Sequence, residues 1–317
     1  MTRHPDDATP LPTAAPGVQL QPAAYEKLLG ALRDSIARLA ADEPFERLVV
    51  PPVISRATIE RAGFAASFPH LLGTVHSYTG TAADWRRLSP LIAEGGDWHT
   101  QQGISDLVLL PAACYPVYAT LDGRDLAEPV RFSVEAQCFR QEATAEPGRL
   151  RTFRMAELVT AGTAEHCQQW REHWLDRVAD WLEALGLKPS VELADDPFFG
   201  GGRRIYQAAQ RAQELKFELR VPVADGLPQA IASANLHKDH FGEAFAFTAD
   251  GATGNTACTA FGLDRIALAL LHAHGSRPAD WPQPIGAALN GTTANSTTAN
   301  STATNSTATN STTSNGD

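Results

Sequence analysis

The sequence predicts an α+β fold in which an antiparallel sheet is flanked by helices. Two alternating segments, 130–139 and 151–159, are separated by the polar stretch 143–149, and this arrangement is typical of a β-hairpin with a long loop. Apolar side chains recur every three or four residues in 164–185, which predicts an amphipathic helix. Hairpin strands accompanied by a few helices favour an antiparallel sheet over a parallel one.

The remaining elements follow from the same apolar spacing. Helices are expected at 21–39, 59–64, 202–215 and 262–272, and strands at 48–50, 107–110, 217–223 and 244–248. The helix at 164–185 carries a stripe of tryptophans, which we interpret as core packing. Thr163 is a suitable N-cap for this helix and Gly186 a suitable stop.

Composition places one folded domain between two polar ends. The chain has 317 residues, 43% of them hydrophobic and 20% charged, so most of it can bury a core. Residues 1–18 are rich in Pro, Ala, Thr and Asp, which predicts a disordered leader. Residues 289–317 are almost only Asn, Ser, Thr, Ala and Gly, which predicts a solvated low-complexity tail. The catalytic domain is therefore expected at 19–288.

The charge balance disfavours two classes of function. Lys and Arg total 26 against 36 Asp and Glu, a net charge of −10, whereas nonspecific nucleic-acid binding requires a basic face. No apolar run approaches the roughly 20 residues that span a bilayer. The N-terminus also lacks the basic and apolar regions of a secretory signal. We therefore expect a cytoplasmic protein without a membrane partner.

The absence of several short motifs disfavours disulfide, zinc-ribbon and common nucleotide-binding sites. The four cysteines (Cys114, Cys138, Cys167 and Cys258) form no CxxC pair and no disulfide framework, and a lone cysteine is most often a buried apolar side chain. Neither GxGxxG nor GxxxxGK[ST] is present, which disfavours Rossmann and P-loop nucleotide binding.

The predicted hairpin carries the most informative charges. Arg140 and Glu142 stand two residues apart, and the return strand adds Arg149, Phe153 and Glu157. Residues two apart on a strand share a face. An arginine there can hold a phosphate through two hydrogen bonds, and a phenylalanine can stack on a purine. On spacing alone, a solvated sheet face remains the alternative.

Three segments resemble the motifs of class II aminoacyl-tRNA synthetases. Motif 2 is resembled by residues 139–157, which contain FRxE, a variable loop and RxxxFxxxE. Motif 3 is resembled by Phe261-Gly262-Leu263-Asp264-Arg265. Pro51-Pro52, after a helix and a strand, resembles motif 1, which builds the dimer interface of that class. The resemblance implies a class II synthetase-like catalytic domain that forms a homodimer.

Within class II, the sequence most resembles the seryl-tRNA synthetases. The chain is too short, however, to include the long helical tRNA-binding arm of that family. Cys114, Glu157 and Cys258 match the positions at which the methanogen-type seryl enzymes hold zinc. Together with the segments 195–199, 215–219 and 235–242, they closely resemble the bacterial amino acid:[carrier protein] ligases. This resemblance covers about residues 25–288.

The resemblance also implies a role for each matching residue. Cys114, Glu157 and Cys258 would hold one Zn²⁺ per chain and leave the fourth position to the substrate α-amino group, which Glu157 also orients. Arg140 would bind the α-phosphate and the amino acid carboxylate, and Arg265 the γ-phosphate, so both are the expected catalytic residues. The ATP pocket would comprise Arg140, Glu142, Arg149, Leu150, Phe153, Gln229 and Arg265.

At one expected Mg²⁺-binding position this sequence departs from the family pattern. Six residues before Asn235 the family carries a Glu that helps hold Mg²⁺, and Gln229 stands there in this sequence. Either its carbonyl binds the Mg²⁺ that accompanies ATP, or the protein binds fewer Mg²⁺ ions. His237 and His240 would suit a second metal only on a helix, and the following Phe241-Gly242 favours a loop, so we do not expect these histidines to be ligands.

The expected function is ATP-dependent activation of a small amino acid, glycine or alanine, followed by transfer to the phosphopantetheine thiol of a small acidic carrier protein rather than to tRNA. Docking of an acidic carrier requires a basic patch, for which Arg203, Arg204 and Arg211 are candidates. A solvated helix face is the alternative for these three.

Two alternative functions stay open. A truncated seryl-type synthetase acting on tRNA is disfavoured by the acidic charge and the missing arm. A catalytically silent regulatory paralogue is disfavoured because Arg140 and Arg265 are intact.

Overall fold

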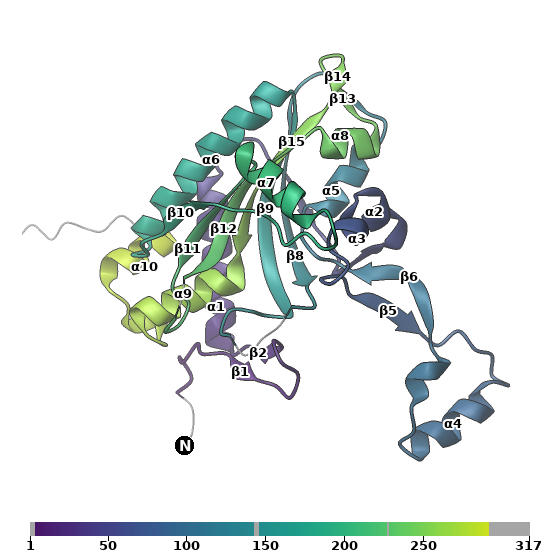
Figure 1. Ribbon diagram of the computed structural model, residues 1–317. Helices are drawn as coiled ribbons and strands as arrows, with labels where there is room; N and C mark the ends of the chain where they lie inside the picture. The colour runs from purple at the N-terminus through teal and green to yellow at the C-terminus, as the bar shows by residue number, and fades with distance from the viewer. Residues whose placement is uncertain (1–3, 143–145, 227, 292–317) are drawn as a thin grey trace, which may run out of the picture.

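The centre of the molecule is a seven-stranded sheet, seen in a computed structural model that describes residues 4–142, 146–226 and 228–291. The strand order is β10-β11-β12-β15-β9-β8-β3 (Figure 1). Its strands are β3 (Glu46–Val49), β8 (Val130–Phe139), β9 (Thr152–Gly162), β10 (Ser190–Leu193), β11 (Lys216–Val221), β12 (Gln229–Lys238) and β15 (Asn255–Gly262). Every pair is antiparallel except β3 with β8. The predicted α+β class and the β8–β9 hairpin are confirmed.

Helices on one face of this sheet bury the larger apolar core. They are α1 (Ala23–Leu39), α6 (Ala164–Ala184), α9 (Leu263–His274) and α10 (Gln283–Asn290), with the short turn η2 (Pro278–Asp280) between the last two. The tryptophan stripe of α6 is core packing, as predicted, and Trp174 is completely buried. Trp170 and Trp174 each donate an indole N–H to Glu43, at 2.9 Å. The Thr163 hydroxyl accepts from the His166 N–H and caps the helix.

Short helices and small sheets cover the other face. The helices are α2 (Arg56–Arg61), α3 (Phe64–Ser67), α5 (Tyr115–Thr120), α7 (Arg203–Ala212) and α8 (His240–Phe245). One small sheet joins β4 (Val53–Ser55), β5 (Thr74–Ser77) and β6 (Gly103–Leu109), and the segment between β5 and β6 carries α4 (Trp85–Ala93) and η1 (Trp98–Gln101) away from the body (Figure 1). The others are β7 (Asp125–Leu126) with β13 (Thr248–Ala249) and β14 (Ala252–Thr253), and β1 (Leu11–Pro12) with β2 (Gln19–Leu20).

Residues 4–18 do not form the predicted disordered leader. The strands β1 and β2 pair with each other, and Ala8 is completely buried in the core. The Ala8 N–H donates to the Ser276 carbonyl and the Arg151 N–H to the Gly17 carbonyl, each at 2.8 Å. Composition misses this segment because backbone hydrogen bonds, unlike apolar side chains, leave no compositional signal. At the other end α10 extends the fold to Asn290, and the tail at 292–317 lies outside the described residues.

Other element predictions need correction. The expected strand at 244–248 is the end of α8 followed by β13, and the expected helix at 59–64 is divided between α2 and α3 at Gly63, whose φ is +75°. The strands β12 and β15 were not predicted. Both strands consist largely of alanine and small polar residues, so the alternation of large apolar and polar side chains that marks a strand is weak. Among the described residues, no helix is long and apolar enough to cross a membrane.

Candidate active site

A cavity of about 480 Å³ opens on the face of the central sheet opposite α6. Phe153 and Glu157 of β9 and Cys258 of β15 line it, whereas their neighbours Leu158 and Phe261 belong to the core under α6. This division follows from the alternation of side chains along a strand. The volume lies within the range of about 300–1,000 Å³ that is usual for small-molecule sites.

The end of the β8–β9 hairpin supplies one wall of the cavity. Arg140 follows β8 directly; its N–H donates to the Arg151 carbonyl at 2.9 Å and its Nε to the Pro111 carbonyl at 3.0 Å. The Arg140 guanidinium lies 5.4 Å from the centre of the Phe153 ring, and Glu142 lines the cavity beside them. Arg140 is therefore held through its Nε, and no hydrogen bond from its two terminal nitrogens to another described residue is seen, so they can meet an anion.

Arg265 enters the cavity from the first turn of α9. Its Nε donates to the Gly148 carbonyl at 2.8 Å and its Nη1 to the Ala230 carbonyl at 2.9 Å. Burial lowers the pKa of Arg265 to about 10, which still leaves the side chain charged at neutral pH. Two arginines from motifs far apart in the sequence therefore line one cavity.

One part of the cavity lining is a close group of three side chains, Cys114, Glu157 and Cys258. One donor atom from each lies within 4.8 Å of the other two, and all three residues are buried. The Cys114 backbone N–H donates to Glu157 Oε1 at 3.1 Å. Burial raises the pKa of the Glu157 carboxyl, and the pKa of the Cys114 thiol is raised well above its usual value by its hydrogen bond with Cys258 and by burial. Two sulfurs and a carboxylate at this spacing form a donor set that suits zinc.

The two histidines that could suggest a second metal do not form a site. His237 lies at the end of β12, and burial lowers its pKa to about 3, so the ring is neutral. His240 begins α8, and Phe241 and Gly242 lie in the same helix, so the loop expected there is wrong. The His240 Nε2 lies 3.0 Å from the Ala62 carbonyl. Neither belongs to the cluster of Cys114, Glu157 and Cys258, which is the one metal-type cluster within the described ranges.

Three predicted ATP-pocket residues do not line the cavity. Arg149 pairs with Glu146 at 2.8 Å, and Leu150 is buried. The Gln229 amide nitrogen donates to Glu146 Oε1 at 3.0 Å and also to the Pro147 carbonyl, while its Oε1 packs against Gly148 and accepts no hydrogen bond from a described residue. Gln229 therefore lies beside the Gly148 turn rather than in the lining of the cavity.

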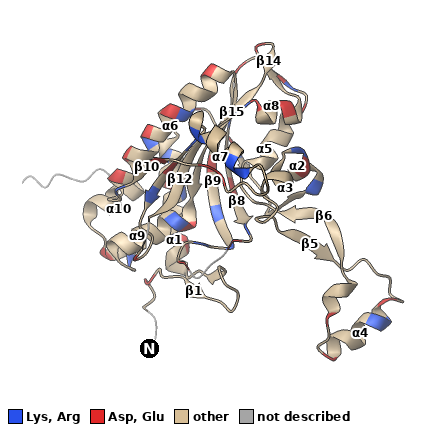
Figure 2. Cartoon of the chain, in the orientation of Figure 1, with Lys and Arg blue, Asp and Glu red and all other residues tan. Residues whose placement is uncertain are grey.

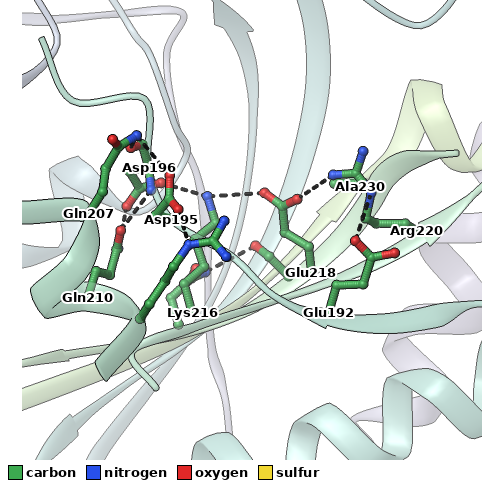
Figure 3. Close-up of polar contacts among 12 residues, drawn as sticks. Glu192, Asp195, Asp196, Gln207, Gln210, Lys216, Glu218, Arg220 and Ala230 are labelled. Atoms are coloured by element: carbon green, nitrogen blue, oxygen red, sulfur yellow. Dashed lines mark hydrogen bonds and ion pairs between the residues drawn. The ribbon is translucent and has the colours of Figure 1, made fainter. Parts of the chain in front are cut away.

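Sequence reasoning assigned no role to a charged network on another wall of the cavity (Figure 3). Lys216 Nζ lies 2.6 Å from Asp196 Oδ1 and 3.3 Å from Glu218 Oε1. Burial alone would lower the pKa of Lys216, but the two carboxylates raise it, so the ammonium persists. All three residues line the cavity and lie within segments of the carrier-ligase resemblance, which is the signal that could have identified them.

The same network holds α7 against the cavity (Figure 3). Gln207 donates to Asp195 at 2.8 Å, Gln210 donates to Asp196 at 2.7 Å, and Arg211 pairs with Asp195. No residue of α7 is buried, so polar contacts rather than core packing fix this helix.

Solved structures define the class of this fold. This chain aligns with the Methanopyrus kandleri seryl-tRNA synthetase, solved with an Aquifex aeolicus tRNASec, at a TM-score of 0.75 and 21% identity over 89% of this chain and 58% of that one. A cytoplasmic seryl-tRNA ligase from Naegleria fowleri, solved with AMP, aligns at a TM-score of 0.65 and 12% identity over 88% of this chain and 55% of that one. The protein has the fold of a class II seryl-tRNA synthetase catalytic domain.

Curated relatives narrow the class to a family. No family model matches the chain. Amino acid–[acyl-carrier-protein] ligases 1 and 2 of Bradyrhizobium diazoefficiens are each 39% identical to it, over 85% and 88% of this chain and 83% and 84% of their own lengths. A type-2 serine–tRNA ligase from Methanococcus aeolicus is 32% identical over 56% of this chain and 36% of its own length. The chain belongs to the amino acid–[acyl-carrier-protein] ligase family and is a ligase.

Proposed function

We propose that this ligase activates a small amino acid, glycine or alanine, with ATP and transfers it to the phosphopantetheine thiol of a small acidic carrier protein. The observation that carries the proposal is the meeting of Arg140, Arg265 and the cluster of Cys114, Glu157 and Cys258 in one cavity. The names of the two 39% identical relatives support a carrier protein as acceptor.

The cluster would hold one Zn²⁺ through two thiolates and one carboxylate. This donor set fits because its atoms lie within 4.8 Å of one another in a buried site and leave one position of a tetrahedral ion open. A bound ion would supply a Lewis acid for the α-amino group of the substrate. Glu157 orients that amine, and the position of the cluster fixes the distance between the amine and Arg140.

Arg140 and Arg265 would then direct the adenylation step. One oxygen of the substrate carboxylate forms a bond to the α-phosphorus of ATP as the bond to pyrophosphate breaks. Arg140 holds the substrate carboxylate and the α-phosphate in line. Its positive charge stabilises the negative charge that grows on the oxygens of the α-phosphorus. Arg265 holds the departing phosphates, Glu142 accepts from the adenine amino group, and Phe153 stacks on the ring.

Magnesium would arrive with the nucleotide. Because Gln229 does not line the cavity, we assign the Mg²⁺ contacts mainly to the ATP phosphates, as is common for this ion. Gln229 instead supports the Gly148 turn, whose carbonyl accepts from Arg265. Arg149, Leu150 and Gln229 thus act on the nucleotide only through their neighbours.

The carrier would dock on α7. Arg203 and Arg204 are exposed, whereas Arg211 is occupied by its ion pair with Asp195, so the candidate patch comprises two arginines rather than three. Figure 2 shows basic positions in blue on α7. Tyr206 and Gln210 of the same helix line the cavity. A carrier bound to Arg203 and Arg204 would therefore deliver its thiol to the adenylate.

A homodimer is part of the proposal. The strand β3 forms a free edge of the central sheet, and its Val49 is 83% exposed next to Pro51-Pro52 of the motif 1 resemblance. An exposed edge strand with an apolar side chain is a surface that a second copy can cover.

The test is amino-acid-dependent exchange between ATP and pyrophosphate across the twenty amino acids, with zinc content and oligomeric state measured on the same sample. We expect exchange with one or two small amino acids, about one zinc per chain, a dimer on size exclusion, and loss of both exchange and zinc in Cys258→Ala. The buried Cys167, which lies outside the cavity, provides the control: Cys167→Ala keeps both.

Each contrary result has its own meaning. Bound zinc without exchange favours the regulatory paralogue, whereas absence of zinc refutes the assignment of Cys114, Glu157 and Cys258. A monomer with full exchange contradicts only the dimer.

A further inference from the structure

Two side chains of β12 place nitrogen atoms beside the sulfur of Cys258. Asn235 Nδ2 lies 3.3 Å from Cys258 Sγ, and His237 Nε2 lies 3.6 Å from it on the same strand. Both distances suit an N–H···S hydrogen bond, which is longer than a bond to oxygen because sulfur is larger. Asn235 also donates to the Ser233 hydroxyl at 3.1 Å, whereas Cys258 is the one partner of His237 Nε2 within the described part of the chain.

His237 occupies an irregular position in the sheet. Leu236 pairs with Ala257 and Lys238 with Thr256, so His237 has no opposite residue in β15. An extra residue of this kind forms a β-bulge, and bulges redirect side chains beside functional sites. The fold therefore departs from the regular ladder at the residue that meets Cys258.

Two hydroxyl groups lie beside the other ring nitrogen of His237, and a hydroxyl can donate to it. His237 Nδ1 lies 3.0 Å from the hydroxyl of Thr256, which is completely buried, and 3.5 Å from the Tyr118 hydroxyl. A hydroxyl that donates to Nδ1 leaves the proton of a neutral ring on Nε2, the nitrogen that faces Cys258.

Aromatic packing fixes the plane of the ring. The His237 ring meets Tyr118 edge-on, with ring centres 5.8 Å apart and planes at 74°, and meets Phe241 at 5.1 Å and 75°. Tyr118 and Phe241 themselves stack at 3.7 Å, so the imidazole rests against a rigid aromatic pair. Its orientation toward Cys258 is therefore set before any metal binds.

His237 does not belong to the ligand set itself. The donor atoms that lie within 4.8 Å of one another come from Cys114, Glu157 and Cys258, and His237 is not among them. Its position beside one sulfur is that of a group that contacts a ligand rather than the ion.

We infer that His237 is a positioning residue of the zinc site, in which its Nε2–H donates to the Cys258 thiolate and holds that sulfur in its ligating orientation. The inference rests on the proposed function, since it requires zinc at Cys114, Glu157 and Cys258. Two thiolates and a carboxylate bring three negative charges to one Zn²⁺, and N–H donors disperse the excess charge in a buried site. Groups that contact metal ligands in this way commonly tune affinity.

The experiment compares zinc affinity, by competition with a chelator, and the sulfur-to-metal absorption bands of the Co²⁺-substituted protein. His237→Phe keeps a flat ring but removes the donor, and we expect zinc affinity to fall about 10- to 100-fold and the Co²⁺ bands to shift. His237→Gln, which restores an N–H, should recover most of the affinity. His240→Gln, which alters the neighbouring histidine that bonds to the Ala62 carbonyl, should leave both readouts unchanged.

The outcomes separate this inference from the proposed function. Wild-type affinity and unshifted bands in His237→Phe would overturn the inference while zinc in the wild type upholds the metal site. A wild type that binds no zinc would overturn both. If His237→Phe does not fold, Thr256→Val decides, because it leaves the ring in place: weaker zinc binding is expected, and unchanged binding would refute the role of Nε2–H.

Discussion

Asp264 shows how one buried residue supports the arginine that follows it. Its side chain is 1% exposed, and its carboxylate accepts from the Arg154 backbone N–H at 2.5 Å, from Gln21 at 2.8 Å and from the Tyr25 hydroxyl at 3.1 Å. The contacts join β9, the start of α1 and the first turn of α9. They therefore fix the point from which Arg265 enters the cavity.

Removal of the Asp264 charge should be costly. Asp264→Asn leaves Arg154 buried with one carboxylate partner fewer, and we expect the free energy of unfolding to fall by about 3 kcal/mol. The KM for ATP should rise because Arg265 loses its support. Urea denaturation and exchange kinetics measure the two effects. Glu26→Gln removes the other, half-exposed partner of Arg154 and should cost less than about 1 kcal/mol; equal losses in both variants would contradict this account.

The candidate site could be predicted from the sequence only in part. Gaps of 43 and 101 residues separate Cys114, Glu157 and Cys258, so no spacing rule could join them, and only the family resemblance did. Arg140, Glu142, Phe153 and Arg265 were placed for the same reason. Lys216 was not assigned, because its role depends on carboxylates that the fold brings together.

At the level of elements, α7 combines exposure with access to the cavity. Polar contacts to Asp195 and Asp196 hold it, and its Ile205 and Tyr206 are 74% and 60% exposed. Apolar side chains beside two arginines offer both contact area and charge to an acidic partner. The helix can therefore serve docking without contributing to the core.

Charge reversal on α7 separates docking from chemistry. Arg203→Glu with Arg204→Glu should raise the KM for the carrier about tenfold, with a smaller effect at high salt, and leave ATP–pyrophosphate exchange unchanged. Arg86→Glu with Arg87→Glu, an adjacent exposed pair on α4 that does not line the cavity, is the matched control. An unchanged carrier KM in the α7 variant would remove the patch from the proposal.

Elements with strong periodicity were predictable, whereas elements that depend on their neighbours were not. The α6 helix and the β8–β9 hairpin carry their own apolar patterns and were found within a few residues. The central strands β12 and β15 are rich in alanine and threonine, and only pairing across the sheet defines them. The β1–β2 pair is held by backbone hydrogen bonds, to which composition is blind.

At the scale of the whole molecule, the two faces of the central, mostly antiparallel sheet differ in role: one packs the core and the other carries the cavity. The face under α6 holds the larger apolar core, while the opposite face carries the cavity. Substitutions in the cavity can therefore change activity with little effect on the α6 core. The acidic surface, at a net charge of −10, adds general repulsion toward any acidic acceptor, so a local basic patch has to provide recognition.

The most direct test of the central claim follows the activated amino acid to its acceptor. The protein is incubated with ATP, radiolabelled glycine or alanine, and one of three acceptors: a carrier protein with its phosphopantetheine arm, the same carrier without the arm, or bulk tRNA. We predict label only on the carrier with the arm, in a thioester that hydroxylamine releases. Label on tRNA, with none on the carrier, would contradict the account.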